Sequence, residues 1–393
     1  MGYRSRYMNM TTKTSIFERY LKEYLQASKK GKGKILDTIC DVTLYQRESA
    51  IRKFRTLQMK DASLPHWRGR KRKYGPDVRA ALRMIFDTSG GLCGELLHAA
   101  IPEYVDVLKQ NKDWKHRPEA TKLLLEMSER TCKRMVKTFR GVKDGRRGIG
   151  STKPSHIKNI VPVFHGSWKS KPVGYGQIDT VVHCGSRLQG EMIYSVNFKD
   201  IQTCWSTRAA QWSKGEIVTC KSIERIEKKL PFPLVGLHPD SGSEFINWNL
   251  KGWTDVRKIE LTRSRPNHSN DNAHIEQNNG NTVRRFVGYV RLDVPEIVPL
   301  MNELYDVLDL YINHFIPTRK CIKKTKTGSK YRRVYDKTKT PYQRALHHKA
   351  IDASLKKQLR LEHVQLNPLH LKKQIDTLIK TIYKYQRDYG DSA

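Results

Sequence analysis

From residue 174 onward the hydrophobic pattern of this 393-residue chain changes, and the change narrows the possible folds sharply. Three short runs rich in Val, Ile, Tyr and Trp follow one another, "GYGQIDTVVHC", "EMIYSVNFKD" and "CWSTRAAQWS", as is typical of strands. The helical stretch "GEIVTCKSIERIEKKL", with Ile217 on its apolar side, precedes a fourth strand in "PLVGLHPDSGSEF". A helix at "INWNLKGWTDVR", a fifth strand at "IELTRSR" and a helix at "SNDNAHIEQNNGNTVRRF" follow. The order predicts an α/β domain with a mixed five-stranded sheet.

Three acids occupy special places in this pattern. Asp179 lies inside the first strand, Asp240 directly follows the fourth, and Glu276 lies in the last helix, which Ser269 or Asn270 would cap. If strands one and four are neighbours, the two aspartates converge at one end of the sheet, where a crossing helix can add Glu276. A buried carboxylate is costly without a partner, and three hard oxygen ligands suit Mg²⁺ or Mn²⁺. Two such ions roughly 3.5–4 Å apart would clamp an in-line displacement at phosphorus.

The stretches around these acids resemble the catalytic core of DDE transposases and retroviral-type integrases. The likeness is to bacterial insertion-sequence transposases in particular, through "DSGSEF" at Asp240–Phe245 and "SRPNHSNDNAHIEQ" at Ser264–Gln277. Between Asp240 and Glu276 stand 35 residues, the spacing typical of that superfamily. The resemblance covers about 174–300 and implies a ribonuclease H-like fold. It also implies that Asp179 and Asp240 hold two Mg²⁺ or Mn²⁺ ions and that Glu276 completes the site.

The same resemblance implies a two-step reaction on DNA. Water first frees a 3′-hydroxyl at the end of a mobile element, and that hydroxyl then attacks target DNA. Because two ends must be handled together, a homodimer or larger assembly on double-stranded DNA is expected. Around the acids, Asn279 could approach DNA and Arg284 and Arg285 could contact phosphates, whereas Glu244 is expected to be structural. Two alternatives remain open: a nuclease or resolvase of the same fold that only hydrolyses, and a domesticated DNA-binding regulator.

The charge of the chain supports a polyanionic partner. Lysine and arginine total 74 against 39 acids, a formal net charge of +35, which favours nucleic acid over a membrane surface. Without a signal peptide or an apolar run near 18 residues, neither secretion nor a membrane span is expected. The seven cysteines form no CxxC and no zinc spacing, which predicts reduced thiols. A cytoplasmic, nucleoid-associated protein is the resulting expectation.

The N-terminal part is predicted to be helical and to bind DNA. In residues 1–73, a short helix around Ile35–Cys40, a turn at 41–43 and a longer helix from Leu44 resemble a helix-turn-helix, with Ile51 among the buried positions. Residues 74–140 predict a second helical DNA-binding domain, in which Ser128 caps a possible recognition helix. The DNA contacts expected from the two domains are Gln46, Arg47, Lys53, Arg130, Lys133 and Arg134.

Basic segments link and end these domains. The run "RGRKRK" at 68–73 and a linker at 141–173, with Arg146 and Arg147 as candidate DNA contacts, are rich in lysine and arginine. The predicted catalytic core spans 174–318. A basic C-terminal region follows at 319–393, in which Tyr331 and Tyr335 are interleaved with cations, as suits DNA binding, and the tail is expected to be helical.

Overall fold

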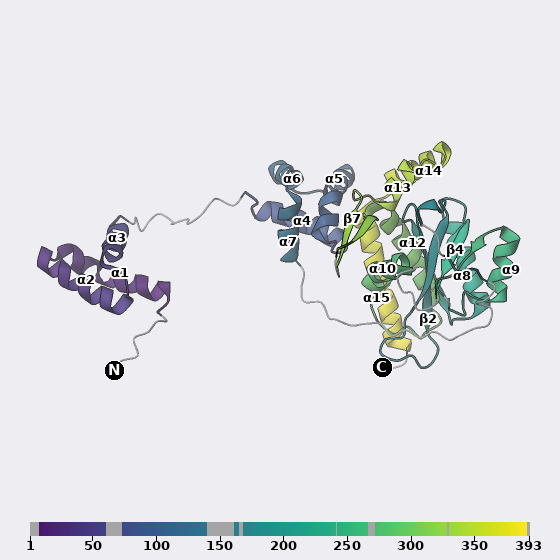
Figure 1. Ribbon diagram of the computed structural model, residues 1–393, viewed down its shortest axis with the longest axis horizontal. Coiled ribbons are helices and arrows are strands. Elements are labelled where there is room, and N and C mark those ends of the chain that lie inside the picture. Colours follow the sequence, from purple (N-terminus) through teal and green to yellow (C-terminus); the bar gives the residue numbers. More distant parts are fainter. Residues whose placement is uncertain are drawn as a thin grey trace. The chain divides into compact units, whose positions relative to one another are not determined.

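The chain forms two compact units in the computed structural model, residues 1–73 and 74–393 (Figure 1). The structure describes residues 8–59, 73–139, 161–164, 168–240, 242–265, 272–327 and 330–390. Each unit is considered by itself below.

The first unit is a three-helix cluster of α1 (Met10–Gln26), α2 (Lys29–Thr43) and α3 (Arg47–Gln58). Phe17, Ile39 and Phe54 are buried where the helices meet. The helix α2 runs through the predicted turn at 41–43 and ends at Leu44, whose φ of 59° is left-handed, so the turn lies at 44–46 instead. Ile51 was predicted to be buried, but it is exposed on the outer side of α3.

The second unit is built on a mixed five-stranded sheet in the order β3-β2-β1-β4-β5. Its strands are β1 (Tyr175–Val182), β2 (Ile193–Asp200), β3 (Ser206–Trp212), β4 (Gly236–Pro239) and β5 (Glu260–Leu261). The pairs β1–β2 and β2–β3 are antiparallel, while β1–β4 and β4–β5 are parallel. The predicted mixed α/β class with five strands is therefore confirmed.

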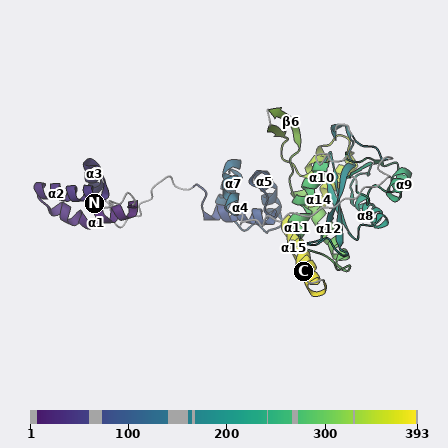
Figure 2. The same ribbon diagram turned by 60° about the horizontal axis from the view of Figure 1, so that its bottom comes forward.

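Helices cover both faces of this sheet (Figures 1 and 2). On one face, α8 (Glu216–Lys229) and α9 (Trp248–Arg257) bury apolar residues against Ile178, Val196 and Phe198. On the other face lies α12 (Ile297–Phe315), a helix with eleven buried residues, which packs on β3. Ile217 was expected on the apolar side of α8 but is 64% exposed at its first turn.

A buried ion pair joins α12 to β3. The guanidinium of Arg208, on β3, is fully buried and donates to Asp309 of α12. The same carboxylate accepts from the backbone N–H of Arg208 at 3.1 Å and pairs with Lys229 of α8 at 2.5 Å. One aspartate thus ties elements from both faces to the edge strand.

The helical segment after the first unit shares its core with later parts of the chain. It consists of α4 (Pro76–Thr88), α5 (Gly94–Gln110), α6 (Pro118–Leu125) and α7 (Glu129–Lys137). Their apolar faces form one cluster with α12 and the long C-terminal helix α15 (Pro368–Tyr389), and α15 matches the predicted helical tail. Ser128 caps α7 as predicted, accepting from the backbone N–H of Thr131 at 3.3 Å. The described residues 74–139 therefore pack together with the later part of the chain.

The remaining elements are a split helix, a β-hairpin and two further helices. The predicted helix after residue 269 is split into α10 (Ala273–Asn281) and α11 (Val283–Val287), with Thr282 at the break. Its expected caps, Ser269 and Asn270, lie outside the described residues. The basic region forms a hairpin of β6 (Cys321–Thr327) and β7 (Lys330–Tyr335), followed by α13 (Pro341–His347) and α14 (Ala353–Gln365). The hairpin extends outward from the second unit (Figure 2).

Candidate active site

Asp179 and Asp240 come from two neighbouring strands of the sheet and lie side by side where β4 ends. The parallel register pairs Ile178 of β1 with Pro239 of β4, so the next residue on each strand is one of the two acids. Backbone N–H groups hold both carboxylates: Thr180 donates to Asp179 and Gly242 to Asp240, each at 2.8 Å. The adjacency of strands one and four, on which the sequence prediction depended, is confirmed.

Side-chain amides hold α10, and with it Glu276, against the sheet. The Gln177 side chain on β1 accepts from the backbone N–H of Ile275 at 3.1 Å. Asn278 donates its amide to the side chain of Asn197 on β2 at 3.3 Å. Asn197 is fully buried and stands opposite Asp179 in the β1–β2 ladder. These contacts fix the position of the helix relative to the two aspartates.

Asn279 connects α10 directly to Asp179. Its amide donates to Asp179 Oδ2 at 2.7 Å, and its carbonyl oxygen accepts from the Asn197 amide at 2.6 Å. Both ends of the side chain are therefore engaged inside the protein, which fixes one oxygen of Asp179. The sequence expected Asn279 to approach DNA; the structure gives it a positioning contact, and its contact with DNA stays a prediction.

The charge of Asp240 affects the pKa of the other two predicted acids. Burial, reinforced by the charge of Asp240 and by weaker repulsion from Glu244 and Glu276, raises the pKa of Asp179 to about 7. Burial and the charge of Asp240 also raise the pKa of Glu276. One carboxylate raises the pKa of another in this way when the two lie in the same small region, so the fold gathers Asp179 of β1, Asp240 after β4 and Glu276 of α10 in one acidic cluster.

Glu244 is a fourth member of this cluster that the sequence did not single out as functional. Its carboxylate is buried; Oε1 pairs with Lys214 at 2.9 Å, and Oε2 has no hydrogen-bond partner among the described residues. A Cβ on Gly242 would stand 2.5 Å from Glu244 Oε2 and 2.9 Å from Asp240 Oδ1. Glycine at 242 thus allows the two carboxylates to approach each other. The Glu-Phe that ends "DSGSEF" was a signal for this position.

The cluster has the ligand types that a hard cation prefers, although its carboxylates are too far apart to coordinate one ion together as they stand. Within the described residues, no three His, Cys, Asp or Glu side chains are close enough to hold a metal ion as they stand. The donors are nevertheless all carboxylates, and neither Asp179, Asp240 nor Glu276 has an ion pair in the described part of the chain. A divalent cation held by Asp179, Asp240 and Glu276 would relieve their repulsion.

Asp179→Asn should stabilise the protein above neutral pH in a buffer with a chelator. Because the pKa of Asp179 rises from 3.8 to about 7 on folding, its carboxylate lowers stability progressively as the pH rises from 4 to 7. Relative to the wild type, the substitution should raise the free energy of unfolding by about 2 kcal/mol more at pH 8 than at pH 4. Comparing the two pH values removes the constant effect of placing an amide opposite the Asn279 amide. Urea unfolding at both pH values measures the difference. An equal gain at pH 4 and pH 8 would contradict the electrostatic cause.

Some of the predicted DNA-contacting residues in the second unit already have partners within the protein, and others do not. Arg284 donates to the backbone carbonyl of Val182 at 2.7 Å, and Arg285 donates to that of Gly90. Lys133 pairs with Glu95 at 2.8 Å and with Glu129 at 3.0 Å. The exposed residues Arg130 and Arg134 on α7 have no ion-pair partner among the described residues. All of these DNA contacts stay predictions.

In the first unit, the residues expected to read DNA also make contacts within the protein. Gln46 is the N-cap residue of α3, Arg47 pairs with Asp37, and Lys53 donates to the hydroxyl of Thr14 at 3.2 Å. Arg146 and Arg147 lie outside the described residues. The helix-turn-helix function of this unit therefore stays a prediction.

Comparison with known proteins places the chain among its relatives. No protein-family model matches it. Among solved structures, the catalytic core domain of the HTLV-2 integrase, solved as a dimer with magnesium, is a neighbour; it covers 43% of this chain and 93% of its own, at 10% identity and a TM-score of 0.28. Among the described residues, no helix has the length and apolar character needed to cross a membrane.

A relative at the level of sequence is the uncharacterized protein y4rM of Sinorhizobium fredii (strain NBRC 101917 / NGR234). The two are 32% identical over 332 residues, which span 84% of this chain and 94% of the relative. Identity at this level over nearly the whole of both chains extends well beyond any single motif, through both the helical segments and the sheet. The chain belongs to the same protein family as y4rM.

Proposed function

We propose that this protein is a DNA transposase that cleaves DNA strands at the ends of a mobile element and joins them to target DNA. The observation that carries the proposal is the acidic cluster: Asp179 and Asp240 lie side by side where β4 ends, and α10, which carries Glu276, is held against β1. The charge of Asp240 raises the pKa of both Asp179 and Glu276. The spacing and motifs around these residues are those of the DDE transposases, as set out above.

In this proposal each acid has a role that follows from its element. Asp179 and Asp240, held by backbone N–H groups, would present fixed oxygens, and Glu276 would approach from α10. Bound Mg²⁺ or Mn²⁺ ions would supply stabilisation of the negative charge that develops at phosphorus. Asn279 would keep Asp179 oriented through its 2.7 Å hydrogen bond. No nucleophilic Ser or Cys is needed, because water or a DNA 3′-hydroxyl is the attacking group.

The charge distribution supports DNA as the substrate. The chain that contains the acidic cluster has a net charge of +35, so the protein as a whole attracts phosphates. The acidic cluster is a local concentration of negative charge within this cationic molecule. Handling two element ends at once would call for a homodimer or larger assembly on DNA.

An assay with DNA from both ends of the genetic locus tests this function. The full chain, purified with Mg²⁺, should nick the element ends and join a precut end with a free 3′-hydroxyl to a plasmid. Joined products on sequencing gels are the expected result. Hydrolysis with no joining would favour the nuclease or resolvase alternative, and DNA binding with neither reaction would favour the regulator.

A further inference from the structure

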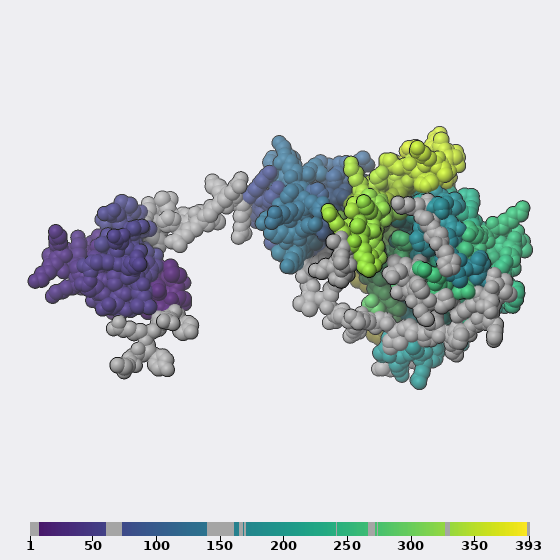
Figure 3. All heavy atoms as spheres, in the orientation of Figure 1, coloured from purple at the N-terminus to yellow at the C-terminus, as the bar shows by residue number. Residues whose placement is uncertain are grey.

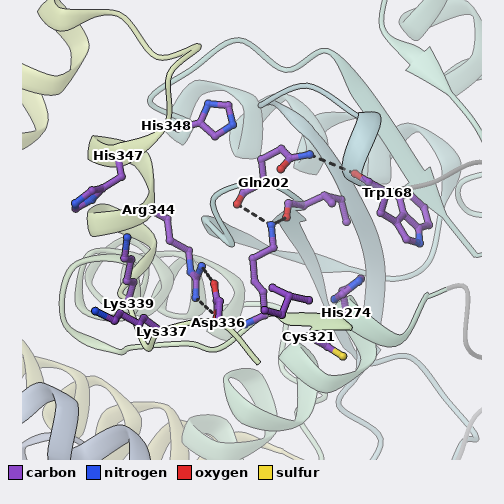
Figure 4. Close-up of a pocket in the computed structure, with 13 residues that line it drawn as sticks. Trp168, Gln202, His274, Cys321, Asp336, Lys337, Lys339, Arg344, His347 and His348 are labelled. Atoms are coloured by element: carbon purple, nitrogen blue, oxygen red, sulfur yellow. Dashed lines mark hydrogen bonds and ion pairs between the residues drawn. The ribbon is translucent and has the colours of Figure 1, made fainter. Parts of the chain in front are cut away.

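A cavity of about 840 Å³ opens at the root of the β6–β7 hairpin, and His274 of α10 forms part of its wall (Figure 4). Most of its lining side chains are cationic or imidazoles. The lining residues used below are Trp168, His274, Lys320, Lys337, Lys339 and Arg344. A pocket of this size lies in the range that encloses a ligand as large as a nucleotide.

Some of the lining cations are already committed to the protein. Lys320 donates to the backbone carbonyls of Ile201 and Gln202 at 2.8 and 3.0 Å. Arg344 pairs with Asp336, the one acid of the lining, and donates to the carbonyl of Thr318 at 2.9 Å. These contacts build the walls of the cavity and neutralise its acid.

Lys337 and Lys339 are different, since no acid pairs with either in the described part of the chain. Figure 4 shows them on the side of the cavity opposite Trp168 and His274. Because the one acid of the lining is already neutralised, two further lysines in the lining leave the cavity with excess positive charge. An anion is the ligand that such a cavity binds.

The hairpin beside the cavity is also cationic, and no acid pairs with any of its described residues. From Cys321 to Tyr335 there is no acid, and Lys324 stands directly opposite Arg333 in the β6–β7 ladder. Like charges directly opposite each other destabilise a hairpin, so this one gains stability when a polyanion lies against it. Its strands are exposed on the surface in Figure 3. A phosphate backbone along the hairpin would lead into the cavity.

The position of His274 relates the cavity to the reaction. His274 lines the cavity and precedes Glu276 by two residues on α10. A DNA strand whose phosphate reacts at the acidic cluster therefore passes the mouth of the cavity within about a nucleotide or two. The cavity has room for one unpaired nucleotide, and Trp168, which packs against Phe164 at 4.4 Å and His238 at 4.8 Å between ring centroids, gives it an aromatic wall for a base.

We propose that this cavity binds an unpaired, phosphate-bearing nucleotide of the DNA strand that flanks the reacting phosphate. Lys337 and Lys339 would contact its phosphates, and Trp168 would contact its base. The proposal rests on the proposed function, because it takes its substrate from the reaction at the acidic cluster. It adds that the enzyme recognises DNA whose end is locally unpaired.

The test compares the binding of two DNA probes to the full chain. One probe is a blunt duplex, and the other is the same duplex with an unpaired tail of four thymidines; fluorescence anisotropy gives their affinities across a range of salt concentrations. The wild type should bind the tailed probe more tightly. In K337Q/K339Q that preference should fall by about tenfold, and the salt slope for the tailed probe should drop by about 1.4, as expected for two contacts to a single strand.

K373Q/K380Q is the matched control, because it removes two exposed lysines from α15 in the same unit. It should leave the preference for the tail within twofold of the wild type. Lys337→Gln alone should lose part of the preference for the tailed probe. Because the Lys337 side chain is exposed, this variant should fold normally and shows whether the loss in the double variant is a folding defect. Equal weakening of both probes in K337Q/K339Q, or a tail preference equal to that of the wild type, would overturn the proposal. So would tighter binding of a ribonucleotide tail.

The two proposals can fail separately. Tail preference is measured by binding and does not depend on strand joining. A tail preference without strand joining would refute the transposase function and support nucleotide binding in the cavity. Strand joining with no loss of tail preference in K337Q/K339Q would refute the cavity and keep the function.

Discussion

Asp240→Asn should reduce both strand cleavage and strand joining by about 1,000-fold or more. The substitution keeps the shape of the side chain and its contact with the backbone N–H of Gly242, but it removes a negative charge from the centre of the acidic cluster. Because the positive surfaces are unchanged, the affinity for element-end DNA should stay within threefold. Gel assays of cleavage and joining, run beside anisotropy measurements of binding, separate the two effects.

Asp255→Asn provides the matched control for this experiment. Asp255 lies on α9, where its carboxylate is exposed and pairs with Lys251 one turn away. It should retain full activity, since a surface ion pair contributes little and the residue lies outside the cluster. Wild-type activity in Asp240→Asn would show that the acidic cluster is not the catalytic site. A large loss in both variants would point to a general effect of removing acids.

The sheet was predictable because its signals are local and because parallel strands obey a simple geometric rule. Runs of β-type residues located the strands, and the adjacency of β1 and β4 placed Asp179 beside Asp240. The hydrogen bonds that fix Asp179 were harder to foresee, because Asp179 lies on β1, Asn197 on β2 and Asn279 on α10. Its role depends on which strands pair and in which register.

Other features could not be predicted because they depend on contacts distant in sequence. The periodic pattern of 272–287 continues through Thr282, where the backbone leaves helical geometry and splits the helix into α10 and α11. Arg284 and Arg285 looked available for phosphates, yet each finds a backbone carbonyl about 100 or more residues away. Charge patterning alone does not distinguish a cation that is free for DNA from one used by the fold.

Asp309→Ala should lower the free energy of unfolding of the second unit by about 3–5 kcal/mol. Arg208 is fully buried, and its guanidinium relies on Asp309 for a counterion, so the substitution leaves an uncompensated charge between β3 and α12. The backbone N–H of Arg208 also loses its acceptor. Urea unfolding at pH 7, followed by tryptophan fluorescence, measures the change.

Asp306→Ala tests whether burial is the cause, because Asp306 lies one turn away on the same helix. Its carboxylate is 48% exposed and pairs with Arg225 and Lys229. Removing it should lower the free energy of unfolding by less than about 1 kcal/mol, since both cations remain in contact with water. Replacing the buried pair as a whole, as R208M/D309L, should recover most of the loss seen with Asp309→Ala, because no charge is then left buried. If R208M/D309L is as unstable as Asp309→Ala, the lost packing of α12 on β3, and not the unpaired guanidinium, accounts for the effect.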